Sequence, residues 1–237
     1  MKIAIYLHSL FVFSIFFRNF VANIIIMALI NIREVYPEVH LGLWQMDESV
    51  NGLLHSFPWM KRYLPELEKR FKSEVRQKEF LVARAMLHEI LVVMGISLQQ
   101  MKGIGEIEHD KNGKPLLKGF RISISHTQGF VAVILSKEKV VGVDIEFYSD
   151  RVKKIASKFL RKDEKAKDLD SLLVHWCGKE TVYKLFSEEN LKFSEMRVMP
   201  FDTMSDWACE VKNLKSGKSV NVDFELTMEF VLTYACM

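Results

Sequence analysis

The sequence predicts an α+β protein built of two similar halves, each a small antiparallel sheet packed on a long helix. Stretches in which apolar and polar residues alternate, as they do in half-buried strands, occur in both halves. Each half also contains one long segment whose apolar residues repeat with the helical period. We expect the halves to span residues 27–137 and 138–237.

Residues 1–26 form an apolar N-terminal extension that differs from the rest of the chain. Arg18 and Asn19 interrupt it, so neither side reaches the ~20 continuous apolar residues that a membrane-spanning helix needs. A signal peptide would precede a secreted domain with paired cysteines, which the sequence lacks. We expect native translation to begin at Met27, which would leave residues 1–26 outside the fold; a membrane anchor is the alternative.

The composition is typical of a globular protein. Apolar residues make up 49% and charged residues 27% of the chain, which excludes disordered and fibrous classes. Cys177, Cys209 and Cys236 are odd in number and contain no CxxC pair, so we expect a cytoplasmic protein with neither a disulfide framework nor a zinc site. The net charge of +3 permits a phosphorylated or acidic ligand without indicating nucleic acid.

In the first half, residues 30–43 alternate as a strand would, and residues 66–94 have the period of a helix that stops at Gly95. The Asn112-Gly113 pair indicates a tight turn, with a hairpin-like loop at 110–115. Across the expected boundary of the halves, short polar turns separate three further alternating segments, which predict an antiparallel meander. These segments are 121–125, 130–135 and 140–147.

In the second half, residues 152–160 and 171–186 have the helical period. Residues 220–235 return to the alternation of strands. The second half therefore repeats the combination of strands and a long helix that the first half shows.

The segment 140–147 (VVGVDIEF) places two carboxylates on one face of a strand. Its apolar residues face one side, so Gly142, Asp144 and Glu146 face the other. Two carboxylates ~7 Å apart on a pleated strand can bind Mg²⁺ and the phosphates that it carries. Gly142 would leave room for such a ligand. The alternative is a pair of solvated acids, the usual fate of isolated carboxylates on a strand.

The segment 171–186 places Glu180 on the apolar stripe of a helix, among leucine and aromatic residues. A carboxylate buried without compensation is costly or becomes neutral, so Glu180 needs a cation. Lys184 lies one helical turn further on. An exposed Glu180–Lys184 pair worth ~0.3–0.5 kcal/mol is the alternative.

Together, VGVDIE (141–146) and WCGKETVYK (176–184) resemble the paired signature of the 4'-phosphopantetheinyl transferase superfamily. The long first half is similar to the larger, pseudodimeric Sfp-like class. This resemblance implies transfer of 4'-phosphopantetheine from coenzyme A to a serine of an apo acyl or peptidyl carrier protein, with release of adenosine 3',5'-bisphosphate. Such carriers serve fatty acid, polyketide or non-ribosomal peptide biosynthesis.

By the same resemblance, Asp144, Glu146 and Glu180 would hold Mg²⁺ on the coenzyme A pyrophosphate, and Lys184 would steady the departing phosphate. Glu180 and Lys184 would thus be the catalytic residues. The serine hydroxyl would attack the β-phosphorus, with Glu180 or a metal-bound water as the base.

The resemblance also implies the residues that contact coenzyme A. Family members use a serine-histidine pair, the lysine of a GKP loop, an arginine on the long helix and lysines that precede it. The matching residues are Ser125 and His126, Lys114, Arg84, and Lys69 and Lys72. Arg84 adds a physical argument, because a guanidinium in an apolar stripe needs an anion such as the 3'-phosphate. A buried Arg–Glu pair is the alternative.

The segment 151–167 is rich in lysine and arginine, and the family docks acidic carrier proteins on the matching helix. We expect Lys154 and Lys158 to contact the carrier; a solvated helix face is the alternative. We expect a monomer with no nucleic-acid or membrane partner.

Two other functions remain open. One is an inactive homologue that binds carrier proteins, and the other is a carrier- or nucleic-acid-binding module whose acids are structural. The intact set of Asp144, Glu146, Glu180 and Lys184 favours an enzyme.

Overall fold

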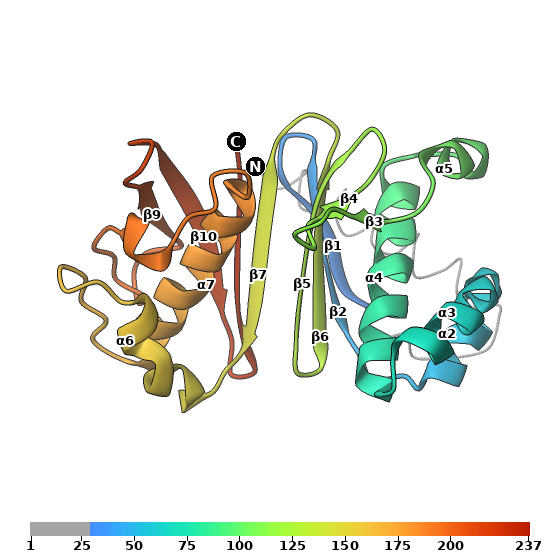
Figure 1. The fold of residues 1–237 in the computed structure, drawn as a ribbon, viewed down its shortest axis with the longest axis horizontal. Coiled ribbons are helices and arrows are strands. Elements are labelled where there is room, and N and C mark those ends of the chain that lie inside the picture. The colour runs from blue at the N-terminus through green and yellow to red at the C-terminus, as the bar shows by residue number, and fades with distance from the viewer. Residues whose placement is uncertain (1–28) are drawn as a thin grey trace, which may run out of the picture.

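A computed structural model describes residues 29–237, so the expected extension at residues 1–26 lies outside the described part. The fold is mixed α and β with antiparallel sheets, which confirms the predicted class. Among the described residues, no helix is both long and apolar enough to cross a membrane. Figure 1 shows two sheets side by side, with helix α4 (Glu74–Val93) on the outer side of one and helix α7 (Leu169–Leu185) on the outer side of the other.

The first sheet has the strand order β1-β2-β6-β5. Its strands are β1 (Leu29–Tyr36), β2 (Val39–Gln45), β5 (Arg121–Thr127) and β6 (Phe130–Ser136). Between β2 and β5 the chain forms helices and a small hairpin. These elements are α2 (Val50–Ser56), η1 (Pro58–Tyr63), α3 (Leu64–Arg70), α4 (Glu74–Val93), α5 (Leu98–Ile104), β3 (Glu108–His109) and β4 (Pro115–Leu116).

The second sheet has the order β7-β11-β10-β9-β8. Its strands are β7 (Val141–Phe147), β8 (Met196–Val198), β9 (Ala208–Asn213), β10 (Ser219–Leu226) and β11 (Phe230–Cys236). Helix α7 packs on this sheet through a continuous apolar cluster. The remaining helical elements are η2 (Asp150–Ile155), α6 (Ala156–Phe159), α7 (Leu169–Leu185) and η3 (Phe193–Glu195).

Three predicted elements are divided in the structure. The segment 30–43 is a hairpin, because the chain turns between β1 and β2 with Glu38 at a φ of 63°. The segment 66–94 is two helices, since α3 ends at Arg70 and α4 starts at Glu74. The alternation at 220–235 comes from two paired strands, β10 and β11.

The predicted meander of three strands is wrong at its third strand. β5 pairs with β6 as expected, but β7 pairs with β11 in the other sheet. β7 nevertheless lies beside β5. Between these two strands, hydroxyl groups of β5 accept hydrogen bonds from amides of β7 in place of backbone-to-backbone hydrogen bonds. The amide N–H of Val143 donates to Ser123 Oγ at 3.2 Å, and that of Phe147 donates to Thr127 Oγ1 at 2.9 Å.

The two sheets are joined by a third apolar cluster, which residues of β2, β6, β7 and β11 form. At the edge of this cluster Tyr36 donates to Asp223, and Arg33 pairs with Glu225. The expected division between residues 137 and 138 falls in the turn from β6 to β7 and stays a prediction. The contact between the sheets brings β5 of the first half beside β7 of the second.

Candidate active site

The predicted alternation of β7 is confirmed. Its apolar residues are buried between the two sheets, so Asp144 and Glu146 lie on the other face, toward α7. Gly142 shares that face, but the expectation that it leaves room for a ligand is wrong. A Cβ at position 142 would lie 2.6 Å from the carbonyl oxygen of Thr181, so the glycine allows α7 to approach β7 closely.

This close approach predicts opposite effects for two glycine substitutions. Gly142→Ala should lower the free energy of unfolding by about 1–3 kcal/mol, because the added methyl meets backbone that cannot move freely. Gly178→Ala is the matched control on α7, where the nearest atoms to an added Cβ are 3.7 Å away. It should stabilise the protein by up to about 1 kcal/mol through helix propensity. Thermal unfolding of both variants tests this, and equal melting temperatures would contradict the packing argument.

Asp144 is the most buried carboxylate of the site, with 6% of its surface exposed. Its Oδ1 accepts hydrogen bonds from Lys184 Nζ and from Ser125 Oγ, both at 2.8 Å. Lys184 Nζ also donates to the carbonyl oxygen of Val143 at 2.8 Å. Asp144 Oδ2 is buried without a hydrogen-bond partner. Such an oxygen is costly to bury unless a cation or a donor reaches it.

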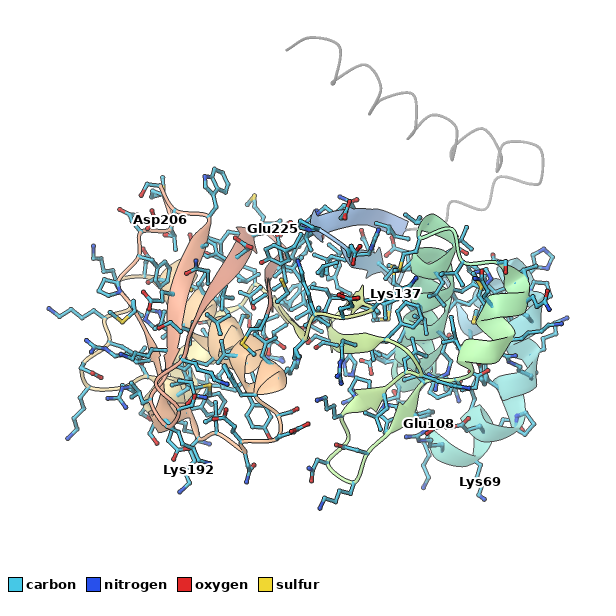
Figure 2. The ribbon with its side chains drawn as sticks, turned by 90° about the horizontal axis from the view of Figure 1, so that it is seen from above. Lys69, Glu108, Lys137, Lys192, Asp206 and Glu225 are labelled. Carbon is cyan, nitrogen blue, oxygen red and sulfur yellow. The ribbon has the colours of Figure 1, made fainter. Side chains whose placement is uncertain are left out.

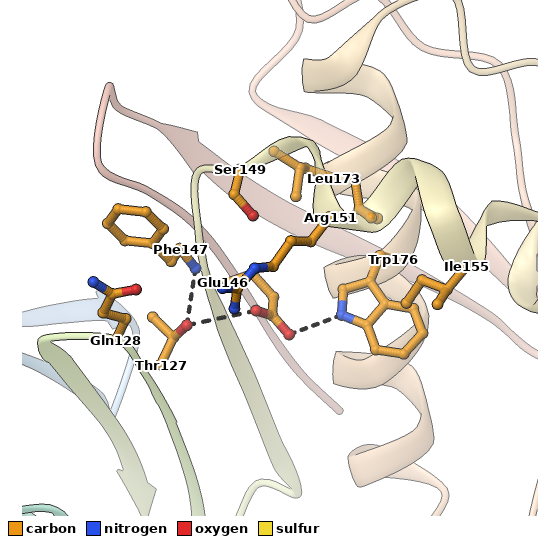
Figure 3. Close-up of a pocket in the computed structure, with 10 residues that line it drawn as sticks. Thr127, Gln128, Glu146, Phe147, Ser149, Arg151, Ile155, Leu173 and Trp176 are labelled. Carbon is orange, nitrogen blue, oxygen red and sulfur yellow. Dashed lines mark hydrogen bonds between the residues drawn. The ribbon is translucent and has the colours of Figure 1, made fainter. Parts of the chain in front are cut away.

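Glu146 is half-buried and accepts a hydrogen bond from Trp176 Nε1 at 3.0 Å. Burial, together with the charge of Asp144, raises the pKa of the Glu146 carboxyl above its ordinary value. Figure 3 shows Glu146 between Thr127 and Trp176, at a cavity of about 570 Å³ whose lining also includes Arg151. The residues around this cavity come from both sides of the β5–β7 contact.

Glu180 projects from α7 and is half-buried, in agreement with its predicted place on the apolar stripe of the helix. Burial first, and then the neighbouring charges of Asp144 and Glu146, raise the pKa of its carboxyl to about 7, against the opposing effect of Lys184. Glu180 also lines a second cavity of about 460 Å³. The three carboxylates and the lysine therefore form one electrostatically coupled group.

The donor set suits a divalent cation in its chemistry. Three carboxylates supply hard oxygen ligands, and the unpartnered Oδ2 of Asp144 is available to a metal. As the side chains stand in the described part of the chain, however, no three His, Cys, Asp or Glu residues are close enough together to hold an ion. Lys184 instead occupies Asp144 Oδ1. Metal binding at these residues therefore stays a prediction, which requires side-chain movement.

Arg84 is buried on α4, with 8% of its surface exposed. Its guanidinium stacks over the ring of Phe80 at 3.2 Å from the centroid and lies 5.2 Å from that of Tyr63. Nη1 donates to the carbonyl oxygen of Phe80, whereas Nε is buried without a partner. Within residues 29–237 Arg84 has no carboxylate partner, so the alternative of a buried Arg–Glu pair is wrong. Burial lowers the pKa of its guanidinium.

Ser125 and His126 lie at the end of β5, beside the carboxylate group. Ser125 binds Asp144, while His126 Nδ1 is 3.5 Å from Glu79 Oε1 on α4. Burial lowers the pKa of the His126 imidazole, and the charges of Arg76 and Lys184 act in the same direction. The structure thus brings these two predicted residues together with Lys184.

Among the described residues, the remaining predicted lysines form no ion pair with the site carboxylates. Lys114 follows the predicted turn, in which Asp110 Oδ1 accepts the amide N–H groups of Asn112 and Lys114. Lys69 at the end of α3 and Lys72 beyond it are exposed, and Figure 2 shows Lys69 pointing outward from the first half. Lys154 in η2 and Lys158 in α6 are exposed on the second half, and Lys158 lines the cavity that contains Glu180.

The region that holds the carboxylates also matches a known family. Residues 140–235 match the family model of the 4'-phosphopantetheinyl transferase superfamily. The second half is similar to this superfamily. The match includes β7 and α7 and therefore Asp144, Glu146, Glu180 and Lys184, whereas the first half lies outside it. No match was found among curated proteins. The match to the superfamily supports a transferase that acts on a phosphopantetheine group.

Two buried residues of this region were not predicted from the sequence. Lys179 and Glu164 form an ion pair with Nζ 2.7 Å from Oε2, and neither side chain is exposed. A signal for Lys179 exists, because it follows Leu172 by two helical turns and so lies on the apolar side of α7. Glu164 lies in an irregular segment, where no periodicity indicates burial.

Proposed function

We propose that the chain transfers 4'-phosphopantetheine from coenzyme A to a serine of an apo acyl or peptidyl carrier protein and releases adenosine 3',5'-bisphosphate. The observation that supports this most is the coupled group of Asp144, Glu146, Glu180 and Lys184 at the contact between the halves. This group lies inside the segment that matches the transferase superfamily. We further propose that the chain is a monomer of the Sfp-like class.

In this proposal Asp144, Glu146 and Glu180 hold Mg²⁺. When bound, the ion would neutralise charge on the pyrophosphate of coenzyme A. The unpartnered Oδ2 of Asp144 and the raised pKa values of the two glutamates are what an ion-free carboxylate site should show. Each carboxylate disfavours ionisation of its neighbours, and a divalent cation would relieve that repulsion.

Proton transfer and the leaving group are assigned to two residues of α7. The serine Oγ attacks the β-phosphorus while the bond from that phosphorus to the bridging oxygen breaks, and the adenosine 3',5'-bisphosphate leaves. Glu180 is the proposed acceptor of the hydroxyl proton. Its pKa is about 7 in the ion-free site, and a bound cation would lower it toward the ordinary value. The departing phosphate becomes more negative as the bond breaks, and the positive charge of Lys184 would stabilise it.

Arg84 is proposed to bind the 3'-phosphate of coenzyme A. Its guanidinium is buried between aromatic rings, lacks a carboxylate partner and keeps one N–H free of hydrogen bonds. Guanidinium groups pair with phosphate through two parallel hydrogen bonds, so a phosphate would complete this arrangement. Lys69, Lys72, Lys114, Ser125 and His126 are proposed to contact other parts of the same ligand.

Substitution of Arg84 tests this assignment. Arg84→Gln should weaken binding of coenzyme A by roughly tenfold or more, since a charge-assisted phosphate contact is lost. Binding of 3'-dephospho-coenzyme A should change little, because that ligand lacks the phosphate. Calorimetry with both ligands measures the effect. Equal losses for the two ligands would place the 3'-phosphate elsewhere.

The function itself is tested by mass spectrometry of the acceptor. The protein, coenzyme A, Mg²⁺ and an apo carrier protein are incubated together, and the carrier should gain the mass of one phosphopantetheine group. A chelator should prevent the gain, and a carrier whose acceptor serine is alanine should remain unmodified. No mass gain with any of several acyl and peptidyl carriers would refute the proposal.

A carrier-protein-binding module without activity is the second candidate. The contact of Lys184 with Asp144 favours it, because that contact occupies one carboxylate oxygen without a metal. Binding of an apo carrier without any mass gain would support this candidate. The nucleic-acid-binding alternative would instead give binding to single- or double-stranded DNA or RNA that needs no Mg²⁺.

A further inference from the structure

Lys179 lies next to Glu180 on α7 but points into the interior, and its side chain is completely buried. All three N–H bonds of its ammonium group have acceptors. Nζ is 2.7 Å from Glu164 Oε2, 2.7 Å from the carbonyl oxygen of Phe159 and 3.5 Å from that of Phe193. A charged ammonium group is stable in the interior only when such acceptors surround it. The segments that carry these acceptors are therefore held at fixed positions around Lys179.

Glu164 extends the same connection. Its Oε2 accepts the amide N–H of Arg161 at 2.7 Å, and its Oε1 accepts that of Val198 at 2.6 Å. The Lys179–Glu164 pair therefore ties four separate segments to α7, which are the end of α6, the turn that follows it, η3 and the end of β8. Within the described residues, no other ion pair has both side chains completely buried.

Two of the tied segments, α6 and η3, also contribute to the cavity of about 460 Å³ that contains Glu180. Lys158 of this cavity directly precedes Phe159, whose carbonyl oxygen Lys179 binds. Phe193 lines the cavity itself, and Lys192 is its neighbour in the chain. Displacement of either carbonyl group would therefore move residues that line the cavity.

This cavity differs from the proposed coenzyme A site in the part of the chain that forms it. Its lining residues all fall between positions 158 and 194, and apart from Glu180 they include none of the residues assigned to coenzyme A or the metal. Two lysines and the apolar side chains of Leu191 and Phe193 contribute to it. An acidic protein surface with apolar residues is complementary to such a lining.

We propose that the Lys179–Glu164 pair positions the acceptor side of the site, by holding α6 and η3 at the spacing through which the carrier protein brings its serine to Glu180. This inference rests on the proposed function. Lys179 is a positioning residue here, since it touches none of the reacting groups. Of the two adjacent residues of α7, Lys179 thus holds the acceptor side in place and Glu180 takes part in the chemistry.

The double variant Lys179→Met/Glu164→Gln tests the proposal. It removes both buried charges together, so no unpaired ion remains, and glutamine can still accept from the amide of Val198. The ties to Phe159 and Phe193 are lost. The matched control is Lys212→Met/Glu210→Gln, the same two changes at exposed positions of β9.

The expected result is a split between kinetic parameters. The KM for the apo carrier should rise about tenfold in the double variant, while kcat falls less than about threefold. The Mg²⁺-dependent Kd for coenzyme A should stay within about twofold, and the control should match the wild type in every parameter. An unchanged KM for the carrier, or an equal loss of coenzyme A affinity, would overturn the proposal.

Hydrogen exchange of the wild-type protein provides a second measurement that does not depend on folding of the variant. An apo carrier should slow amide exchange in residues 156–164 and 191–198, whereas coenzyme A alone should not. No protection of these segments by a carrier that binds would overturn the proposal. Failure of the proposed transfer would instead appear as absence of mass gain in the wild type, so the two failures are distinguishable.

Discussion

Glu180→Gln should reduce phosphopantetheine transfer by about 10²–10⁴-fold, because the variant lacks both the proposed base and one proposed metal ligand. The same substitution should stabilise the metal-free protein above neutral pH. Both effects follow from one property of the site, which is that burial and neighbouring carboxylates hold the pKa of Glu180 at about 7.

The sign of the stability effect follows from proton binding. The pKa of Glu180 is higher in the folded protein than the ordinary value of 4.5, so the folded state binds the proton more tightly than the unfolded state. Stability is therefore complete at low pH and falls as the pH rises from about 4.5 to 7. After allowance for solvent screening, the loss at pH 8 is roughly 1–2 kcal/mol. Glutamine is neutral throughout and avoids this loss.

Thermal unfolding with a chelator present measures the effect. At pH 8 the variant should melt about 2–8 °C above the wild type, and at about pH 4, below the ordinary pKa of the carboxyl, the two should melt nearly together. Mg²⁺ should raise the melting temperature of the wild type at pH 8 and leave that of the variant nearly unchanged. Glu188→Gln, at an exposed position after α7, is the control. A melting difference that is independent of pH would show that the charge of Glu180 is not the cause.

The parts of the site that the sequence could predict depend on local geometry. Alternation along a strand places Asp144 and Glu146 on one face whatever the strand pairs with, and the structure confirms this. The 3.6-residue period places Glu180 and Lys184 one turn apart on α7 in the same way. The fold class was predictable for the same reason, because each strand and helix carries its own periodicity.

Pairing between distant segments was not predictable from local pattern. β7 follows β6 after a short turn, so a meander was the simplest expectation, but β7 pairs with β11 from the end of the chain. The sequence does contain a clue in the hydroxyl residues of β5. Ser123 and Thr127 satisfy amide groups of β7 that a neighbouring strand would otherwise bond, and no periodicity rule detects this. The role of Gly142 was misread for the same reason, since its contact is with α7.

Asp144→Ala should abolish both Mg²⁺-dependent binding of coenzyme A and transfer to the carrier. Asp144 is the carboxylate that accepts hydrogen bonds from Lys184 and Ser125. Its removal takes away a proposed metal ligand, so negative charge is lost where the metal should bind. It also leaves the ammonium group of Lys184 without its carboxylate partner, so an unpaired positive charge would repel the metal. We expect turnover to fall by about 10³-fold or more, the upper part of the range for loss of a single electrostatic contact.

The companion variants separate the two roles of Asp144. Asp144→Asn keeps an acceptor for Lys184 and Ser125 but lacks the negative charge, so it should fold as the wild type does and still fail to bind Mg²⁺. Ser125→Ala removes a hydrogen bond and keeps the charge, and should retain Mg²⁺-dependent binding of coenzyme A with weaker affinity. Calorimetry with and without a chelator distinguishes them. If Asp144→Asn binds coenzyme A in a Mg²⁺-dependent manner, the buried carboxylate serves only to hold Lys184 in place, and the metal must be bound by other residues.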